Sequence, residues 1–334
     1  MGEEARIAVL GAGSWGGTLA WLLGSAGRDV SLWTHNSEKL QQLQETRRLG
    51  KPLPITIPAN VKIHVDLNTC IADADVIIFA CTAQTMRSVA QKVQVGIDKN
   101  RKDLALVSVA KGLELGTDLR MTEILRQAIP SASACSLSGP NLAAEILNGL
   151  PCASVIACED ESVARRVQEA LSVPTMRLYT NTDVIGVEMG GALKNVMAIA
   201  AGVVDGLDLG INAKAGLMTR GLAEMTRLAV AKGAQAITLS GLAGMGDLVA
   251  TCYSSLSRNY RLGYRVARGD SVETAQRELG ATAEGVTTAE AVCELSRTLG
   301  IELPIAQQVD MTVRGLRAPR QAIMSLMTRP LASE

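Results

Sequence analysis

Short, continuously apolar runs alternate with amphipathic stretches along the first half of the chain. The run at 6–10 (RIAVL) is dominated by apolar residues, which is typical of a strand buried on both faces of a sheet. Six further runs repeat this pattern, at 29–33, 61–65, 75–81, 104–109, 132–139 and 153–157. Helical spacing of apolar residues fills most of the intervals, at 15–26, 37–46, 84–96, 118–128, 141–148 and 161–171. Strands that alternate with helices predict βαβ units and a parallel sheet.

The pattern changes after residue 183. Residues 184–232 carry almost no strand pattern and are rich in Ala, Leu and Met, which favour helices. Glycine and serine residues at 240–259 predict loops, and helical spacing returns at 262–280, 287–298 and 305–316. The chain therefore predicts an α/β domain over residues 1–182, followed by an all-helical domain over residues 183–334.

One apolar segment is long enough to cross a membrane. Residues 184–204 form a run of 21 mostly apolar residues. The run contains Glu188, Lys194 and Asn195, and charged side chains at the centre of a bilayer are costly. We therefore expect a buried helix in the middle of the second domain and no membrane span.

Composition and charge exclude several classes of function. Hydrophobic residues make up 47% of the chain and charged residues 20%, which is typical of a globular protein rather than a disordered one. The 33 basic and 33 acidic residues cancel, so no overall positive field favours nucleic acid. Aromatic residues make up only 2%, too few for a platform that stacks single-stranded bases.

Cysteine and histidine usage limits the chemistry further. The seven cysteines contain no CxxC pair and mostly lie in apolar runs, so we expect reduced core thiols in a cytoplasmic protein. The N-terminal segment shows no export signal. Only His35 and His64 are present, so we expect no metal site, and acid–base catalysis must work largely without histidine.

The segment GAGSWG at 11–16 follows the first predicted strand and opens a helical run. This GxGxxG pattern is typical of the dinucleotide-binding turn of a Rossmann domain. Gly11 would allow the tight turn, Gly13 the approach of a pyrophosphate, and Gly16 the close packing of helix on strand. The alternative is a glycine-rich turn without a ligand. The context favours NAD(H) or NADP(H) as the cofactor.

The acidic residue that usually binds the ribose 2′-hydroxyl is missing from the end of the second predicted strand. That strand ends in Trp33-Thr34-His35-Asn36, and the next carboxylate is Glu38. An adenosine 2′-phosphate would not be repelled there, and His35 with Arg47 or Arg48 could contact it. The sequence thus favours NADP(H), or tolerance of both cofactors. Alternatively, Glu38 folds back to the ribose, or His35 is only a surface residue.

Two predicted strands end in residues that could bind a substrate. Lys111 follows the strand at 104–109, and ligands of open parallel sheets bind beyond the carboxyl ends of the strands. Asn141 follows the Gly139-Pro140 break after the strand at 132–139. Lys111 is either a ligand group or a surface lysine, and Asn141 is either a ligand contact or a helix cap.

Lys194 lies inside the apolar segment with Gly190 and Ala198 one turn away on either side. Burial would lower its pKa toward neutrality, which suits a general acid or base. The alternative is an ion pair with a carboxylate elsewhere in the chain. Lys111 is the competing proton carrier, but we expect solvent to keep the pKa of that loop lysine high.

The segment at 244–263 carries Asp247 near its start and Ser257-Arg258-Asn259 near its end. An arginine between two hydrogen-bonding side chains suits a phosphate group, because the guanidinium offers two parallel donors. The alternative is a serine that caps a helix, followed by a solvated arginine.

Seven segments together resemble the family of bacterial-type NAD(P)-dependent glycerol-3-phosphate dehydrogenases. They are GAGSWGGTLA (11–20), KGLE (111–114), LSGPNLAAEI (137–146), DVIGVEMGGALKNVMAIAAG (183–202), DGLDLGINAKAGLMTRGLAEM (205–225), GLAGMGDLVATCYSSLSRN (241–259) and AEGVTTA (283–289). The resemblance extends from about residue 5 to 310. It implies reversible reduction of dihydroxyacetone phosphate to sn-glycerol 3-phosphate, which supplies glycerophospholipid synthesis. A homodimer formed through the helical domain is a family-level expectation.

The resemblance also implies roles for individual residues. Lys194 matches the family's catalytic proton acceptor. The substrate-binding positions would be Lys111, Gly139, Asn141, Lys194, Asp247, Ser257, Arg258 and Asn259. The cofactor-binding positions would be Gly11, Gly13, Ser14, Trp15, Gly16, His35, Lys111, Ala143, Arg258 and Glu284. Two alternatives stay open: a related dehydrogenase acting on another hydroxyacid or phosphorylated alcohol, and a non-catalytic NADP-sensing protein.

Overall fold

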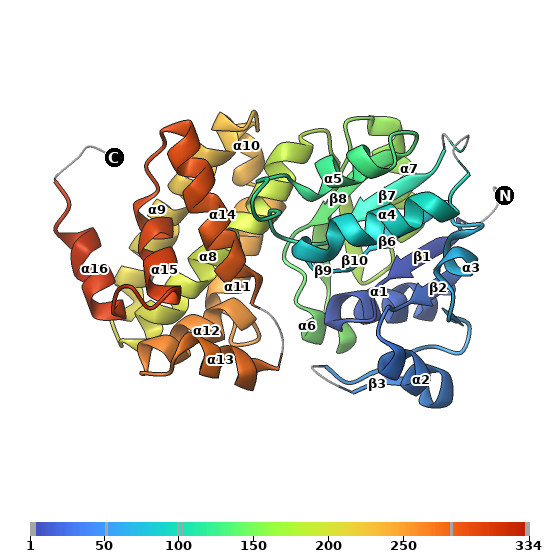
Figure 1. The fold of residues 1–334 in the computed structure, drawn as a ribbon, viewed down its shortest axis with the longest axis horizontal. Helices are drawn as coiled ribbons and strands as arrows, with labels where there is room; N and C mark the ends of the chain where they lie inside the picture. The colour runs from blue at the N-terminus through green and yellow to red at the C-terminus, as the bar shows by residue number, and fades with distance from the viewer. Residues whose placement is uncertain (1–4, 51–52, 99–100, 102, 281–282, 331–334) are drawn as a thin grey trace.

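The central strands carry apolar residues on both faces because helices cover both faces of their sheet. The structure, a computed structural model, describes residues 5–50, 53–98, 101, 103–280 and 283–330. On one face Ile7 and Val9 pack with α1 (Ser14–Ser25) and α7 (Glu161–Leu171). On the other face Ala8 and Leu10 pack with α4 (Met86–Gly96) and α5 (Met121–Ala128). Figure 1 shows this layered half beside a group of helices.

Eight strands form the main sheet, in the order β10-β9-β8-β7-β6-β1-β2-β5. They are β1 (Ile7–Leu10), β2 (Val30–Trp33), β5 (Lys62–His64), β6 (Val76–Phe79), β7 (Ala105–Ser108), β8 (Ser133–Ser138), β9 (Cys152–Ala157) and β10 (Met176–Asn181). All seven predicted strands are confirmed, and β10 was not predicted. A separate two-stranded sheet pairs β3 (Arg48–Leu49) with β4 (Ile55–Thr56).

The sheet is parallel, as predicted, except at one place, where β8 and β9 are antiparallel. Their connection contains only the five-residue α6 (Ala143–Leu147). A parallel crossover usually needs a longer helix that carries the chain back along the sheet. The remaining helices of this half are α2 (Ser37–Thr46), α3 (Leu67–Ile71) and the short 3-10 helix η1 (Ala83–Thr85).

The rest of the described chain is helical, which confirms the predicted fold class of a Rossmann α/β unit followed by helices. Its elements are α8 (Val184–Gly206), α9 (Gly210–Ala231), α10 (Ala236–Leu239), η2 (Leu242–Gly246, a π-helix), α11 (Asp247–Tyr253), α12 (Arg258–Ala267), α13 (Val272–Leu279), α14 (Glu284–Leu299), α15 (Pro304–Val313) and α16 (Pro319–Met327).

The loop expected at 240–259 is mostly helical, and this prediction is wrong. The glycines there allow close packing of helices instead of forming turns. A Cβ on Gly244 would lie 2.0 Å from the carbonyl oxygen of Leu239, and one on Gly190 of α8 would lie 2.5 Å from that of Ala243. Small residues thus let η2 approach α8, and α11 follows η2 directly.

Helix α8 lies among the other helices of the second half and contacts α9, α11, α12 and α14 (Figure 1). Its apolar content and length would suffice to cross a membrane, but 94% of its most apolar window is buried inside the chain. A second segment, Ala236–Tyr253, has similar length and hydropathy and is 44% buried. Such burial of α8 is typical of the core helix of a soluble protein.

A buried ion pair joins the sheet half to α8. Arg120, which precedes α5, donates to Glu188 of α8 at 2.7 Å, and both side chains are about 6% exposed. Thr122 adds two hydrogen bonds to the same carboxylate, from its backbone N–H at 2.9 Å and its hydroxyl at 2.5 Å. Because these bonds fix the start of α8 against the sheet, they also fix the direction in which α8 carries Lys194.

Candidate active site

The predicted dinucleotide turn lies where the strand order of the sheet reverses, between β1 and β6. Ligands of open α/β sheets bind at such a point. Gly11 follows β1 with a φ of +123°, and a Cβ there would lie 2.5 Å from the carbonyl oxygen of Ala80. At Gly13, the N-cap of α1, a Cβ would meet no described atom within 4 Å. No described side chain caps α1, so its first N–H groups are available to a phosphate.

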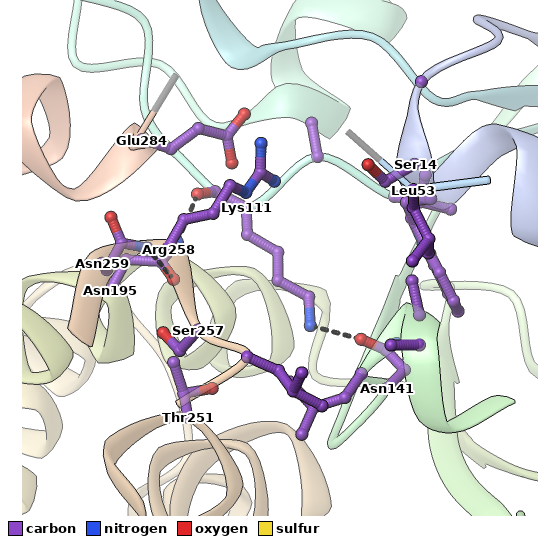
Figure 2. A pocket seen from close by; sticks show the side chains of 18 of the residues that line it. Ser14, Leu53, Lys111, Asn141, Asn195, Thr251, Ser257, Arg258, Asn259 and Glu284 are labelled. Carbon is purple, nitrogen blue, oxygen red and sulfur yellow. Dashed lines mark hydrogen bonds between the residues drawn. The ribbon is translucent and has the colours of Figure 1, made fainter. Parts of the chain in front are cut away.

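A cleft of about 440 Å³ opens from this turn and continues between the two halves of the chain. Its walls combine residues that lie far apart in the sequence (Figure 2). The predicted site residues that line it are Gly13, Ser14, Trp15, Lys111, Asn141, Ala143, Lys194, Ser257, Arg258, Asn259 and Glu284. The volume is within the range that small-molecule and cofactor sites occupy.

Five predicted residues do not line the cleft itself: Gly11, Gly16, His35, Gly139 and Asp247. Gly11 and Gly16 touch each other behind the turn, where a Cβ on Gly16 would lie 1.9 Å from the carbonyl oxygen of Gly11. Gly139 accepts a hydrogen bond from the Lys111 ammonium at 3.0 Å. His35 is exposed just beyond β2. Asp247 is only 1% exposed and lies behind the two lysines of the cleft.

Asp247 is bonded to both lysines. Its Oδ2 accepts from Lys111 Nζ at 2.7 Å, and its Oδ1 accepts from Lys194 Nζ at 2.7 Å. Lys194 is thus in an ion pair, which was the alternative to an isolated buried lysine. The two ammonium groups and one carboxylate leave one net positive charge at the wall of the cleft. This charge suits an oxygen that becomes negative during a reaction.

The expectation that solvent keeps the pKa of Lys111 high is wrong. The loop after β7 folds into the cleft, and the Lys111 side chain is only 13% exposed. Burial lowers the pKa of Lys111 to about 8; the Asp247 carboxylate opposes this shift, and the Lys194 ammonium adds to it. Lys111 can therefore lose its charge at a pH well below that of an unperturbed lysine, whose pKa is about 10.4.

Asn141 is part of the same cluster and does not cap a helix. The N-cap of α6 is Leu142, and the Asn141 amide oxygen accepts from Lys111 Nζ at 2.8 Å (Figure 2). Its amide nitrogen donates to Ser154 at 3.3 Å. The carbonyl of Gly139 and the amide of Asn141 therefore hold Lys111 from the β8 side, while Asp247 holds it from α11.

Ser257 and Arg258 stand at the start of α12. The Ser257 side chain accepts from the backbone N–H of Tyr260, so Ser257 is the N-cap, as the alternative interpretation of this motif expected. Arg258 is exposed and lines the cleft. Burial raises the pKa of Glu284, while the positive charge of Arg258 works against that shift. A guanidinium at a helix N-terminus is thus available at the cleft for an anion.

The Asn259 amide is engaged with the protein. Its nitrogen donates to Asn195 Oδ1 at 2.9 Å (Figure 2). Its oxygen accepts from the backbone N–H of Gly285 at 3.0 Å. Asn195 in turn donates to the carbonyl oxygen of Lys111 at 3.1 Å. This chain of amides links the loop of Lys111 to α8, α12 and the start of α14.

Thr251 is a cleft residue that was not predicted. Its hydroxyl accepts from Lys194 Nζ at 2.7 Å and lies 3.2 Å from Asp247 Oδ1. Thr251 and Asp247 are four residues apart on α11, so they share one face of the helix. The spacing of four residues is visible in the sequence, but it indicates a shared face only if the segment is a helix. The glycines and serines at 240–259 predict a loop instead.

The nucleotide end of the cleft offers one donor without a partner. The indole Nε1 of Trp15 is buried and has no hydrogen-bond partner among the described residues. A buried donor of this kind is normally satisfied, which fits a ligand at this position. The turn, the free helix end and this indole are therefore compatible with a bound dinucleotide.

Arg47 does not face the cleft. Its guanidinium donates to the carbonyl oxygens of Ile57, Pro58 and Val61, and so anchors the chain that leads into β5. Arg48 is exposed beside it. Of the two arginines considered for a 2′-phosphate, Arg48 is the one whose guanidinium is not committed to these carbonyl groups.

The seven cysteines carry free thiols, and five of them are buried. Within the described ranges, no three His, Cys, Asp or Glu side chains are grouped so that they could hold a metal ion.

Comparison with known proteins assigns both halves of the chain to one family. The family model for the N-terminus of NAD-dependent glycerol-3-phosphate dehydrogenase matches residues 6–164, and the model for its C-terminus matches residues 183–324. The glycerol-3-phosphate dehydrogenase of Parvibaculum lavamentivorans is 43% identical over 330 residues, covering 98% of each chain. That of Corynebacterium glutamicum (strain R) is 44% identical over 333 residues, covering 98% of this chain and 99% of the relative. A crystal structure of glycerol-3-phosphate dehydrogenase from Coxiella burnetii has a TM-score of 0.91 and 34% identity, covering 98% and 99%.

Proposed function

The chain belongs to the NAD-dependent glycerol-3-phosphate dehydrogenase family, and from this membership we propose how its cleft carries out the family's reaction. The protein is an oxidoreductase that reversibly reduces dihydroxyacetone phosphate to sn-glycerol 3-phosphate, with NADH or NADPH as cofactor. The product is the backbone donor of glycerophospholipid synthesis. When bound, the cofactor supplies or accepts the hydride.

Lys194 transfers the proton to and from the substrate oxygen. Its ammonium is held by Asp247 and Thr251, both at 2.7 Å, so it keeps one direction toward the cleft. Lys111 contributes a second positive charge on the other side of Asp247. Together they stabilise the alkoxide that forms when the ketone carbon is reduced, which is the electrostatic contribution that usually matters most.

Arg258 binds the phosphate group of the substrate. The support is its place at the N-terminus of α12, on the same wall of the cleft as Lys194 and Asn195. Ser257 caps the helix, so the direction of its first N–H groups is fixed. Asn141 and Gly139 act on the substrate side by holding Lys111, and Asn259 acts through Asn195.

The dinucleotide lies along the first half of the cleft. Gly11, Gly13 and Gly16 form the turn, and the N–H groups at the start of α1 bind the pyrophosphate. Ser14, Trp15 and Ala143 line the cofactor side of the cleft, and Glu284 and Arg258 close it from the helical half. His35 lies just beyond β2, where the adenosine ribose would be placed, and Arg48 is an exposed residue of β3.

The observation that carries this proposal is the single carboxylate shared by Lys111 and Lys194 at the wall of a cleft with a dinucleotide turn. The direct test is NADPH oxidation with dihydroxyacetone phosphate, followed by chiral analysis of the product. Dihydroxyacetone and a 2-ketoacid serve as comparison substrates. Faster turnover of the ketoacid would favour the related dehydrogenase instead, and cofactor binding without turnover would favour the NADP-sensing protein.

We further propose that residues 1–182 and 183–334 are separate domains and that the enzyme works in the cytoplasm as a homodimer. What supports the domain division is that β10 ends at Asn181 and α8 begins at Val184. For the dimer, Ile211 on α9 and Val249 and Tyr253 on α11 are 74%, 41% and 53% exposed, on helices that contact each other. Light scattering tests the proposed dimer. We expect the wild type to be a dimer and the Ile211→Asp variant to be a monomer.

A further inference from the structure

Two cysteines face each other across the antiparallel pair β8 and β9. The register pairs Ser136 with Ala157 and Leu137 with Ile156, so the next opposite pair is Cys135 and Cys158. Directly opposite residues point to the same face of a sheet. Both thiols accordingly belong to the same buried apolar cluster, and they are 0% and 3% exposed.

The backbone bonds show which kind of opposite pair this is. The N–H of Cys158 donates to the carbonyl oxygen of Asn181 in β10, so it points away from β8. The N–H of Ser133, two residues before Cys135, donates to Leu104 on the opposite side of β8. Cys135 and Cys158 therefore form a non-hydrogen-bonded pair, in which Cα atoms lie about 4.5 Å apart. Disulfides form at Cα separations of about 4.4–6.8 Å.

The contact between the two sulfurs shifts their pKa values in opposite directions. The thiol of Cys135 donates a hydrogen bond to the sulfur of Cys158, and the backbone N–H of Asp160 donates to it as well; both bonds lower the pKa of Cys158. The same contact, together with burial, raises the pKa of Cys135. The contact between the two sulfurs therefore favours ionisation of Cys158 over ionisation of Cys135. A thiolate is the form that attacks an oxidant.

We propose that Cys135 and Cys158 are an oxidation site, which hydrogen peroxide converts into a cross-strand disulfide. The Cys158 sulfur attacks one peroxide oxygen, the O–O bond breaks, and the leaving hydroxide takes a proton to become water. The Cys135 sulfur then attacks the sulfur of the resulting sulfenic acid, and the S–O bond breaks. The thiol proton leaves with that hydroxide as a second water. In total, the two thiols lose two electrons, and one molecule of hydrogen peroxide is reduced to two molecules of water.

The disulfide would covalently close the loop formed by residues 136–157, which lie between the two cysteines. That connection includes Gly139 and Asn141, which hold Lys111 in the cleft. The Cα separation of a non-hydrogen-bonded pair lies within the range that disulfides adopt, so the bond can form without a large movement of the two strands.

The experiment treats the full-length protein with hydrogen peroxide, alkylates the remaining thiols under denaturing conditions, and maps the disulfide by mass spectrometry. No Lys or Arg lies between Arg126 and Arg165, so trypsin would leave both cysteines in one peptide. A protease that cleaves after glutamate separates them at Glu145. We expect a bond linking Cys135 to Cys158 and its loss after treatment with dithiothreitol.

Cys152 provides the matched control, because it lies on β9 and remains in the same glutamate-cleaved peptide as Cys158. The Cys152→Ser protein should form the same bond, whereas Cys135→Ser and Cys158→Ser should not. Mapping of the wild type and of Cys152→Ser decides the matter even if the buried variants fail to fold. A bond that uses Cys152, oxidation of Cys158 to sulfinic acid without a disulfide, or full alkylation of all cysteines after peroxide treatment would each overturn the proposal.

Discussion

The ammonium groups of Lys111 and Lys194 bind opposite oxygens of the Asp247 carboxylate, each at 2.7 Å. The two lysines come from different halves of the chain, one after β7 and the other in α8. Their shared counter-ion means that the charge of each depends on the charge of the other. The active site is thus one electrostatic unit that forms only when the two halves are packed together.

This arrangement predicts that the rate of ketone reduction depends on pH through the ionisation of Lys111. Burial and Lys194 lower the pKa of Lys111 to about 8, so Lys111 loses its positive charge as the pH rises through that value. We propose that this charge stabilises the developing alkoxide, and on that basis kcat/KM for ketone reduction should fall as the pH rises through 8. Steady-state kinetics across this range measures the inflection.

Lys111→Arg is the control for that assignment, because arginine stays protonated at every pH of the assay. The Lys111→Arg enzyme will have lower activity, since the planar guanidinium fits the ammonium site poorly. Its pH profile should nevertheless be flat where the wild type falls. An unchanged inflection would assign the ionisation to another group of the cleft, with Lys194 as the first candidate.

Arg258 is predicted to anchor the substrate phosphate. Arg258→Lys keeps the charge but loses the two parallel donors, so kcat/KM for dihydroxyacetone phosphate should fall about tenfold or more. Dihydroxyacetone, which lacks the phosphate, should be a very poor substrate of the wild type. Arg261→Lys, at a neighbouring exposed arginine that also lines the cleft, serves as the matched change. If only Arg261→Lys weakens substrate use, the anchor is Arg261.

The nucleotide end predicts that NADPH is used at least as well as NADH. No carboxylate ends β2, and Arg48 of β3 is exposed, so we expect Arg48→Ala to lower kcat/KM for NADPH about tenfold and to leave NADH unchanged. Arg47→Ala should instead lower the melting temperature, because Arg47 holds the carbonyl groups at 57–61. A wild-type preference for NADH of about a hundredfold, or 2.7 kcal/mol, would contradict the prediction.

The buried ion pair between Arg120 and Glu188 should contribute strongly to stability. Arg120→Met leaves the Glu188 carboxylate buried without its cation, which should cost about 3–5 kcal/mol of the free energy of unfolding. The matched change is Arg126→Met on α5, the helix that Arg120 precedes. Its partner Glu159 is 68% exposed, so this change should cost about 1 kcal/mol or less. Urea denaturation measures both. Equal costs for the two variants would mean that the hydrogen bonds from Thr122 stabilise the buried Glu188 carboxylate without help from Arg120.

The sequence predicts the layered half well because its signals are local. Continuous apolar runs mark strands buried on both faces, and the GxGxxG turn marks the cofactor end of the cleft. Prediction fails where distant contacts decide the structure. The glycines at 241–246 suggest a loop by themselves, but Gly190 of α8 and Gly244 form a close helix contact instead. The antiparallel pairing of β8 with β9 likewise depends on tertiary contacts rather than on the local pattern.

The same limit applies to the lysines. Spacing alone predicts that Lys194 is buried, but it gives no indication that Asp247 lies beside it. The sequence also predicts a solvent-exposed Lys111, whereas the loop folds so that this side chain is largely buried in the cleft. Solvent exposure therefore does not separate the two lysines as proton carriers, because both side chains are largely buried beside Asp247.

Lys194→Met tests whether Lys194 carries the proton. Methionine preserves the length and apolar character of the side chain while removing its proton and its charge. General acid–base catalysis is worth about 10²–10⁴-fold, and loss of alkoxide stabilisation adds to this, so kcat should fall by about a thousandfold or more. Cofactor affinity should barely change, because the dinucleotide is held mainly by the turn at 11–16. Thermal melting must show an intact fold, since the change leaves Asp247 with one partner fewer.

Lys111→Met, made in parallel, separates the two lysines. If Lys194 carries the proton, Lys111→Met should weaken substrate binding more than turnover, because Lys111 then contributes charge but no proton transfer. Measured kcat and KM for both variants give this comparison directly. A folded Lys194→Met enzyme that keeps more than about a tenth of the wild-type kcat, together with a Lys111→Met enzyme that has lost it, would move the proton to Lys111. Asp247 would then orient Lys111 and leave Lys194 as the fixed positive charge.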